Sequence, residues 1–165
     1  MPALMAVTTP TRNSFRRIRP HAWSGAYQAW GIANKEAALR LIPGSRSGKP
    51  ANVELKTMDA TANPYLALGV MVAAGLDGIR RDLRLPQPAD IDPADYSGAQ
   101  RAQLGIEALP AAPERALRAF LQDAVLQEAM GERMAAVYTA VRQAELESLA
   151  DLTFAEERDL LLQRY

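Results

Sequence analysis

The sequence predicts an α+β fold, with short antiparallel strands in the first third of the chain, followed by a buried helix and C-terminal helices. Three observations support this prediction. Short runs of β-forming residues, separated by turns rich in glycine and proline, lie before residue 58. A long apolar segment then follows a group of helix-capping residues and a proline near residue 64. After residue 112, apolar residues recur at helical spacing.

The three expected strands cover residues 25–31, 37–42 and 52–57. Turn-forming residues at 43–45 and 47–50 separate the last two strands, which predicts an antiparallel pair around a glycine-containing loop. Residues 2–7 are also apolar and β-like, but they have no obvious partner strand nearby. Because so few short strands do not complete a sheet, we expect an upstream portion of the domain to be missing.

A buried helix is expected over residues 64–79. Asn63 offers a capping oxygen, Pro64 suits the first helical position, and the segment is apolar on nearly every face. The next residues, 85–112, contain four prolines and scattered acids, which predicts a long irregular connection.

The end of the chain is expected to be helical. Pro113 opens an amphipathic segment, Gly131 separates it from a second one, and Thr153 and Glu156 have capping-box spacing ahead of a last helix at 158–165. We therefore expect one domain over residues 1–165 in three parts. These are the strands and buried helix of 2–84, the connection of 85–112 and the helical tail of 113–165.

The composition excludes several classes of protein. The 165 residues include no cysteine, so a disulfide scaffold, a thiolate zinc site and a cysteine nucleophile are ruled out. His21 is the only histidine, so no multi-histidine metal site forms within one chain. The longest apolar stretch, residues 65–76, is shorter than the roughly 20 residues of a membrane span, and residues 1–9 lack a basic leader. We expect a cytoplasmic protein with no membrane partner.

The charges balance overall but are unevenly distributed. Residues 1–63 carry nine basic and three acidic side chains, whereas residues 64–165 carry ten basic and sixteen acidic ones. A basic first third suits an anionic ligand such as phosphate, carboxylate or nucleic acid. Attraction between the two halves of the chain is an equally good explanation.

Two motifs in the basic region suggest chemistry without specifying it. Arg16, Arg17 and Arg19 form a cluster that suits a phosphate or carboxylate, although such a run is more often a solvated strand edge. Glu54 and Lys56 alternate on one strand and share a face. They suit a metal and an anion, or they pair with each other, which is the simpler expectation.

Taken together, five separated motifs resemble the C-terminal half of the glutamine synthetase catalytic domain. The motifs are Asn13-Ser14-Phe15-Arg16-Arg17, Asn34-Lys35-Glu36-Ala37-Ala38-Leu39-Arg40, Glu54-Leu55-Lys56, Ala62-Asn63-Pro64-Tyr65-Leu66-Ala67 and Val72-Ala73-Ala74-Gly75-Leu76-Asp77-Gly78-Ile79. Their order and nearly constant spacing make the resemblance specific. It covers residues 2–84 closely, and the helical tail only in its organisation.

The resemblance implies an ATP-dependent ligase. Such enzymes use ATP and Mg²⁺ or Mn²⁺ to phosphorylate the side-chain carboxylate of glutamate, and ammonia or another amine then displaces the phosphate. Their active sites lie between neighbouring subunits of a homo-oligomeric ring. A basic first third fits this chemistry because the triphosphate, the glutamate and the γ-glutamyl phosphate are all anionic. The ligase explains these residues better than nucleic-acid binding does.

The resemblance also implies roles for individual residues. By position, Arg17 and Lys56 are expected to hold glutamate. The nucleotide phosphates are expected to bind Lys35, Arg40 and Lys49. Glu54 is expected to bind a hard divalent metal. The family usually has arginine where this chain has Lys35 and Lys56. The positive charge is kept, but a lysine does not form the paired hydrogen bonds by which a planar guanidinium holds a carboxylate or phosphate.

Trp23 departs from the family pattern in the loop where ammonia-using members carry a glutamate that binds and deprotonates ammonium. An indole does not act as a base, but it packs against an apolar or larger amine. Residues 23–27 resemble the branch whose members include γ-glutamyl ligases for other amines. The alternative is that Trp23 is a core or interface aromatic.

Other parts of the family's active site lie upstream of the matched region. They include the remaining metal carboxylates, the metal-binding histidine and a glycine-containing substrate loop. We therefore expect this chain to be inactive alone. The alternative is a non-catalytic binding subunit or interaction protein derived from the same family.

Overall fold

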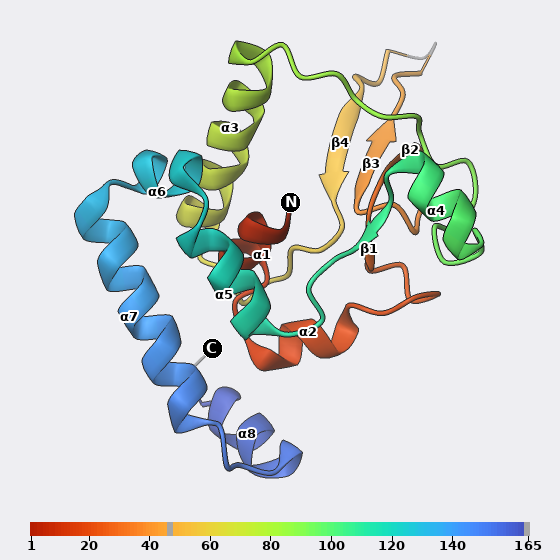
Figure 1. Cartoon of the computed structure of the whole chain (residues 1–165). Helices are drawn as coiled ribbons and strands as arrows, with labels where there is room; N and C mark the ends of the chain where they lie inside the picture. Colours follow the sequence, from red (N-terminus) through yellow and green to blue (C-terminus); the bar gives the residue numbers. More distant parts are fainter. Residues whose placement is uncertain (46–47, 164–165) are drawn as a thin grey trace.

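The computed structural model describes residues 1–45 and 48–163, and Figure 1 shows a group of helices beside two small sheets. The helices are α1 (Pro2–Thr8), α2 (Arg12–Arg17), α3 (Pro64–Arg80), α4 (Gly98–Leu104), α5 (Pro113–Leu121), α6 (Ala124–Met130), α7 (Glu132–Ser148) and α8 (Phe154–Leu161). The strands are β1 (Tyr27–Gln28), β2 (Trp30–Ile32), β3 (Leu39–Ile42), β4 (Asn52–Leu55) and β5 (Glu107–Ala108). The α+β prediction is confirmed. Part of the expected 47–50 turn and the end of the expected last helix, 164–165, lie outside the described residues.

The expected antiparallel pair is present as β3 and β4, with Arg40 opposite Glu54. The expectation that all the strands are antiparallel is wrong for β2, which runs parallel to β3. Residues 33–38 carry the chain back along β2, and the Leu39 N–H then donates to the Ala29 carbonyl at 3.1 Å. A short irregular return of this kind leaves no periodic signal in the sequence.

Residues 2–7 form α1 rather than the expected strand. Pro2 occupies the first turn, and the alanines, Leu4 and Met5 that follow favour a helix. The helix packs against α5 and α3 (Figure 1), which buries Met5 and Val7 almost completely. The segment reads as β-like because a short helix that is buried on most sides has no polar face to reveal its period.

The main core joins the two ends of the chain. Phe120 of α5 is fully buried, and its ring meets Tyr138 of α7 edge to face, with centroids 6.2 Å apart. The Tyr138 hydroxyl donates to the Ala6 carbonyl of α1 at 2.7 Å. The helical tail therefore closes over the start of the chain.

Helix α3 begins as expected but is not buried. The Asn63 side chain accepts from the Tyr65 and Leu66 N–H groups, and Pro64 takes the first turn. Only Ala67 and Val70 of the helix are buried, because α3 packs on α1 and α6 along one side. The exposed large apolar residues on it are Tyr65, Leu68, Val72, Leu76 and Ile79, and we call these five the α3 stripe.

The connection over 85–112 is more ordered than expected. It contains α4, which a Ser97–Gln100 capping box begins, and β5, which pairs with β1. Ala89 and Ile106 pack with Ala29 in a second small core beside the sheets. None of the helices in the described residues is long and apolar enough to cross a membrane.

Candidate functional site

Arg17 is the last residue of α2, so the expected strand edge at Arg16 and Arg17 is instead the end of a helix. The Arg17 guanidinium donates to the carbonyls of Lys56 (3.0 Å), Thr57 (2.6 Å) and Met58 (3.3 Å) in the turn after β4. It also lies 3.7 Å from the Asp59 carboxylate. Arg17 therefore brings the end of α2 to the end of β4, beside Lys56.

A buried carboxylate from the far end of the chain orients α2. Glu157 of α8 is fully buried, and its Oε2 lies 3.2 Å from Nη2 of Arg16 and 3.8 Å from Nε of Arg12. The Arg16 guanidinium also lies 4.3 Å from the centre of the Phe154 ring. Sequence analysis missed Glu157, because its partners are about 140 residues away and only its place in a capped helix marks it.

Arg40 and Glu54 form an ion pair across β3 and β4, with 3.1 Å between Nη1 and Oε2. The expectation that Glu54 pairs with Lys56 is therefore wrong. Residues directly opposite on antiparallel strands have Cβ atoms about 5 Å apart, closer than neighbours two residues along one strand. The Arg40 Nε is buried without a hydrogen-bond partner, so the ion pair satisfies only part of the guanidinium.

The divalent metal that the resemblance implies has a single candidate ligand here, Glu54. Its carboxylate is already neutralised by Arg40, and within the described residues it belongs to no group of three metal-ligating side chains. One paired carboxylate does not hold a divalent ion. The residues of this chain therefore do not by themselves fit the metal.

Trp23 lies in an exposed loop and contacts the expected phosphate-binding Lys35. The Lys35 Nζ lies 4.7 Å from the centre of the Trp23 ring, and the backbone N–H of Trp23 donates to the Glu36 carboxylate at 3.0 Å. The Trp23 residue is 63% exposed, so the interpretation of it as a core aromatic is wrong. Gly25 lies at the end of this loop, in close approach to Ala38, the residue directly before β3.

Lys49 lies apart from the other expected residues. In the loop between β3 and β4, its backbone N–H donates to the Ser45 hydroxyl, and its carbonyl accepts from the Ser45 backbone N–H. Lys49 is exposed. The structure thus joins Arg17 to Lys56, Arg40 to Glu54 and Lys35 to Trp23, and leaves Lys49 in the loop.

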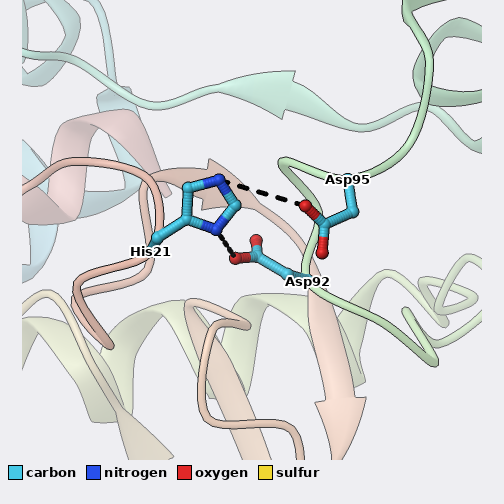
Figure 2. Close-up of side chains that lie close together, drawn as sticks. All are labelled: His21, Asp92 and Asp95. Atoms are coloured by element: carbon cyan, nitrogen blue, oxygen red, sulfur yellow. Dashed lines mark ion pairs between the residues drawn. The ribbon is translucent and has the colours of Figure 1, made fainter.

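A cluster that sequence analysis did not identify lies beside the Trp23 loop. Figure 2 shows His21 with a carboxylate facing each of its ring nitrogens, with Nδ1 2.8 Å from Asp92 and Nε2 3.9 Å from Asp95. In the sequence, His21 is marked only by being the sole histidine and by lying two residues before Trp23. Its partners come from the 85–112 connection, about 70 residues later.

Comparison with known proteins gives consistent matches along the chain. Residues 1–160 match the family model for the glutamine synthetase catalytic domain. The chain is 42% identical over 154 residues to a gamma-glutamylpolyamine synthetase of Streptomyces coelicolor, covering 92% of this chain and 33% of that protein. It is 39% identical over 143 residues to a glutamine synthetase of Methanocaldococcus jannaschii, covering 87% and 31%.

Solved structures match equally well. A crystal structure of a glutamine synthase homolog aligns with a TM-score of 0.74 at 36% identity, covering 92% of this chain and 33% of that one. A GmaS/ADP complex aligns with a TM-score of 0.74 at 30% identity, covering 97% and 36%. The chain therefore spans about a third of the length of the relatives it matches. With the family model matched over nearly the whole chain, this protein belongs to the glutamine synthetase family.

Proposed function

We propose that this chain forms part of an ATP- and divalent-metal-dependent ligase that joins the γ-carboxylate of glutamate to an amine through γ-glutamyl phosphate. Family membership supports this reaction, since glutamine synthetases are in general ATP- and metal-dependent. The observation that carries it is the convergence at the β3–β4 pair. Arg40 and Glu54 pair across these two strands, and Arg17 at the end of α2 binds the backbone carbonyl of Lys56, the residue directly after β4.

The proposed roles follow the charges. Arg17 and Lys56 hold the glutamate, and Lys35, Arg40 and Lys49 hold the phosphates, where cations stabilise the charge that develops during phosphoryl transfer. Arg40 is available to phosphate only when it turns from Glu54. The assignment of Glu54 as a metal ligand remains a prediction from the resemblance, since this chain alone does not form the site.

The proposed amine is larger than ammonia. Trp23 is exposed at the position where ammonia-using members of the family carry a glutamate that accepts a proton from ammonium. Its ring offers an apolar surface for an alkyl amine. The 42% identity to a gamma-glutamylpolyamine synthetase supports the same class of substrate. We further infer that the complete enzyme is a cytoplasmic homo-oligomeric ring. The isolated chain is expected not to catalyse the reaction.

A chimera tests this proposal. The segment of the Streptomyces coelicolor relative that this chain matches is replaced by residues 1–160, and amine-dependent phosphate release from ATP is measured with glutamate and either a polyamine or ammonia. We expect turnover that favours the polyamine, and a loss of about 100-fold or more on Arg17→Ala. Arg19→Ala, at an exposed arginine two residues away, is the matched control. A chimera that assembles normally but releases no phosphate with any amine overturns the proposal.

The isolated chain gives a second readout. Mixed with Mg-ATP, glutamate and amine, it is expected to release no phosphate above the blank. Clear turnover by the 165-residue chain contradicts the inference that it is inactive alone.

The α3 stripe favours a second candidate function, a non-catalytic subunit that binds a longer relative. Its five apolar residues are exposed by between 44% and 87%, a surface that soluble monomers rarely leave open. Size-exclusion chromatography after co-expression with a full-length family member distinguishes the two functions. A stable mixed assembly whose activity is unchanged favours the binding subunit, whereas separate elution argues against it.

A further inference from the structure

The His21 cluster combines one imidazole with two carboxylates from a separate segment. Each residue offers one ligand atom, and the three atoms all lie within 4.8 Å of one another (Figure 2). Ligand atoms about 2.1 Å from a metal are separated by about 3 to 4 Å, depending on their positions around it. The 2.8 Å between His21 Nδ1 and Asp92 Oδ2 is just below that separation, and the 3.9 Å between Nε2 and Asp95 Oδ1 lies within it. One ion takes one of the two nitrogens, so the carboxylate beside the other nitrogen shifts toward the ion; the Asp95 side chain is 58% exposed.

The two carboxylates have no other cationic partner among the described residues. In the part of the chain that the structure describes, Asp92 and Asp95 form ion pairs with His21 alone, which is charged only when protonated. The nearby Arg101 is turned elsewhere, because its Nη1 donates to three backbone carbonyls of the turn, those of Pro93, Ala94 and Tyr96. With a neutral imidazole the cluster therefore carries two uncompensated negative charges.

The turn that carries the carboxylates is held independently of His21. Asp92 Oδ1 accepts the Ala94 N–H at 2.8 Å, which leaves Oδ2 directed at the imidazole. The Asp95 N–H donates to the Asp92 carbonyl at 2.9 Å, and Arg101 braces the same turn through its carbonyls. Preorganised ligands lose little conformational entropy when an ion binds.

We propose that His21, Asp92 and Asp95 bind one divalent transition-metal ion of the Zn²⁺ type. One imidazole nitrogen and two carboxylate oxygens form the mixed donor set that such ions accept, whereas Mg²⁺ and Ca²⁺ favour all-oxygen sites. Three protein ligands leave the remaining positions to water. This site is separate from Glu54 and does not depend on the proposed ligase activity.

The bound ion joins two segments that are far apart in sequence. His21 lies two residues before Trp23, and Asp92 and Asp95 lie in the 85–112 connection. The metal thus fixes the Trp23 loop against the connection, a positioning role for the residue proposed to face the amine.

The single histidine makes the test unusually direct. The 165-residue chain, free of any histidine tag and labelled with ¹⁵N-histidine, is titrated with Zn²⁺ and followed by NMR of its one imidazole and by isothermal titration calorimetry. We expect one ion per chain and a changed imidazole signal that saturates at one equivalent. Co²⁺ is expected to give a visible absorption band typical of bound metal.

Matched variants separate this site from adventitious binding. Asp92→Asn and Asp95→Asn are expected to weaken Zn²⁺ binding, the former by about 100-fold, since even indirect partners of a ligand are worth about 10- to 100-fold. Asp90→Asn removes a neighbouring exposed carboxylate outside the cluster and is expected to bind normally. An imidazole signal that ignores Zn²⁺, or an affinity equal in Asp92→Asn and Asp90→Asn, overturns the proposal. Because no ATP, glutamate or amine is present, that result leaves the proposed ligase untouched.

Discussion

At the scale of single residues, Arg17 has a structural task as well as its expected role at the site. Its two Nη atoms donate to three consecutive carbonyls after β4, and a carboxylate lies close by. Only a planar guanidinium reaches several acceptors at once, because a lysine ammonium is a single point on a flexible stem. The same donors that fix the turn also set the position of Lys56.

Replacing Arg17 by lysine is therefore expected to lower the free energy of unfolding by about 1 to 2 kcal/mol, the value of two lost hydrogen bonds. The measurement is urea unfolding of the isolated chain. Arg19→Lys, at an exposed arginine, is expected to change it by less than about 0.5 kcal/mol. Equal stability in the two variants would contradict the structural task.

The Thr153–Glu156 capping box is a second residue-scale device, and its pH dependence follows from its hydrogen bonds. The Thr153 side chain, and then its backbone N–H, donate to the Glu156 carboxylate and lower the pKa of Glu156 below its ordinary value of 4.5. A lowered pKa stabilises the folded state above the ordinary value, and the stabilisation is lost as pH falls through the lowered one. The start of α8 is therefore expected to fray in acid.

Backbone NMR shifts of residues 154–157, followed from about pH 7 to about pH 2, measure this fraying. Thr153→Ala is expected to remove most of the transition, because the donors to Glu156 are then reduced to the backbone N–H. A transition unchanged in Thr153→Ala would show that Glu156 does not respond to this cap.

At the scale of elements, the approach of the Trp23 loop to β3 requires a glycine. Gly25 has φ +73°, and a Cβ there would lie 2.7 Å from the Ala38 Cα, a backbone atom that has no room to yield. Gly75 in α3 has open space around it and an ordinary helical backbone.

The two glycines form a matched pair of predictions with opposite signs. Gly25→Ala is expected to destabilise the chain by about 2 kcal/mol or more, through left-handed strain and the clash with Ala38. Gly75→Ala is expected to stabilise it by about 0.5 to 1 kcal/mol, because alanine loses less entropy in a helix. Thermal unfolding of both variants checks the signs.

At the scale of the whole molecule, the buried Glu157 joins the last helix to the second. It is fully buried and shared between Arg12 and Arg16, so Glu157→Gln weakens both contacts while keeping the shape. We expect a loss of about 1 to 3 kcal/mol in unfolding free energy and faster proteolysis within residues 149–163. Glu147→Gln, an exposed glutamate of α7, is the control and is expected to be neutral. Equal proteolysis of the two would mean that Glu157 does not hold α8.

Local features were predictable wherever neighbouring residues decide the structure. The β3–β4 pair, the Asn63 cap, the break at Gly131 and the Thr153 capping box all depend on residues within a few positions of one another. The parallel pairing of β2 with β3 and the helical conformation of α1 were not predicted. The first depends on the irregular return over residues 33–38, and the second on packing against α3 and α5, far along the chain.

The site divides in the same way. Its basic residues and Glu54 were recognisable from the sequence through ordered motifs, and the family match agrees with that reading. Which side chains pair was not recognisable: Glu54 meets Arg40 across the sheet, and His21 meets carboxylates about 70 residues away.

The sequence by itself determined the family, the α+β class and the local helix and turn signals, because these reside in short-range order and composition. Only the tertiary structure decided the pairing of charges, the burial of α1 and Glu157, and the exposure of the α3 stripe. The reason is physical. Burial and ion pairing are properties of atoms brought together across the fold, and spacing along the chain does not specify which distant surfaces meet.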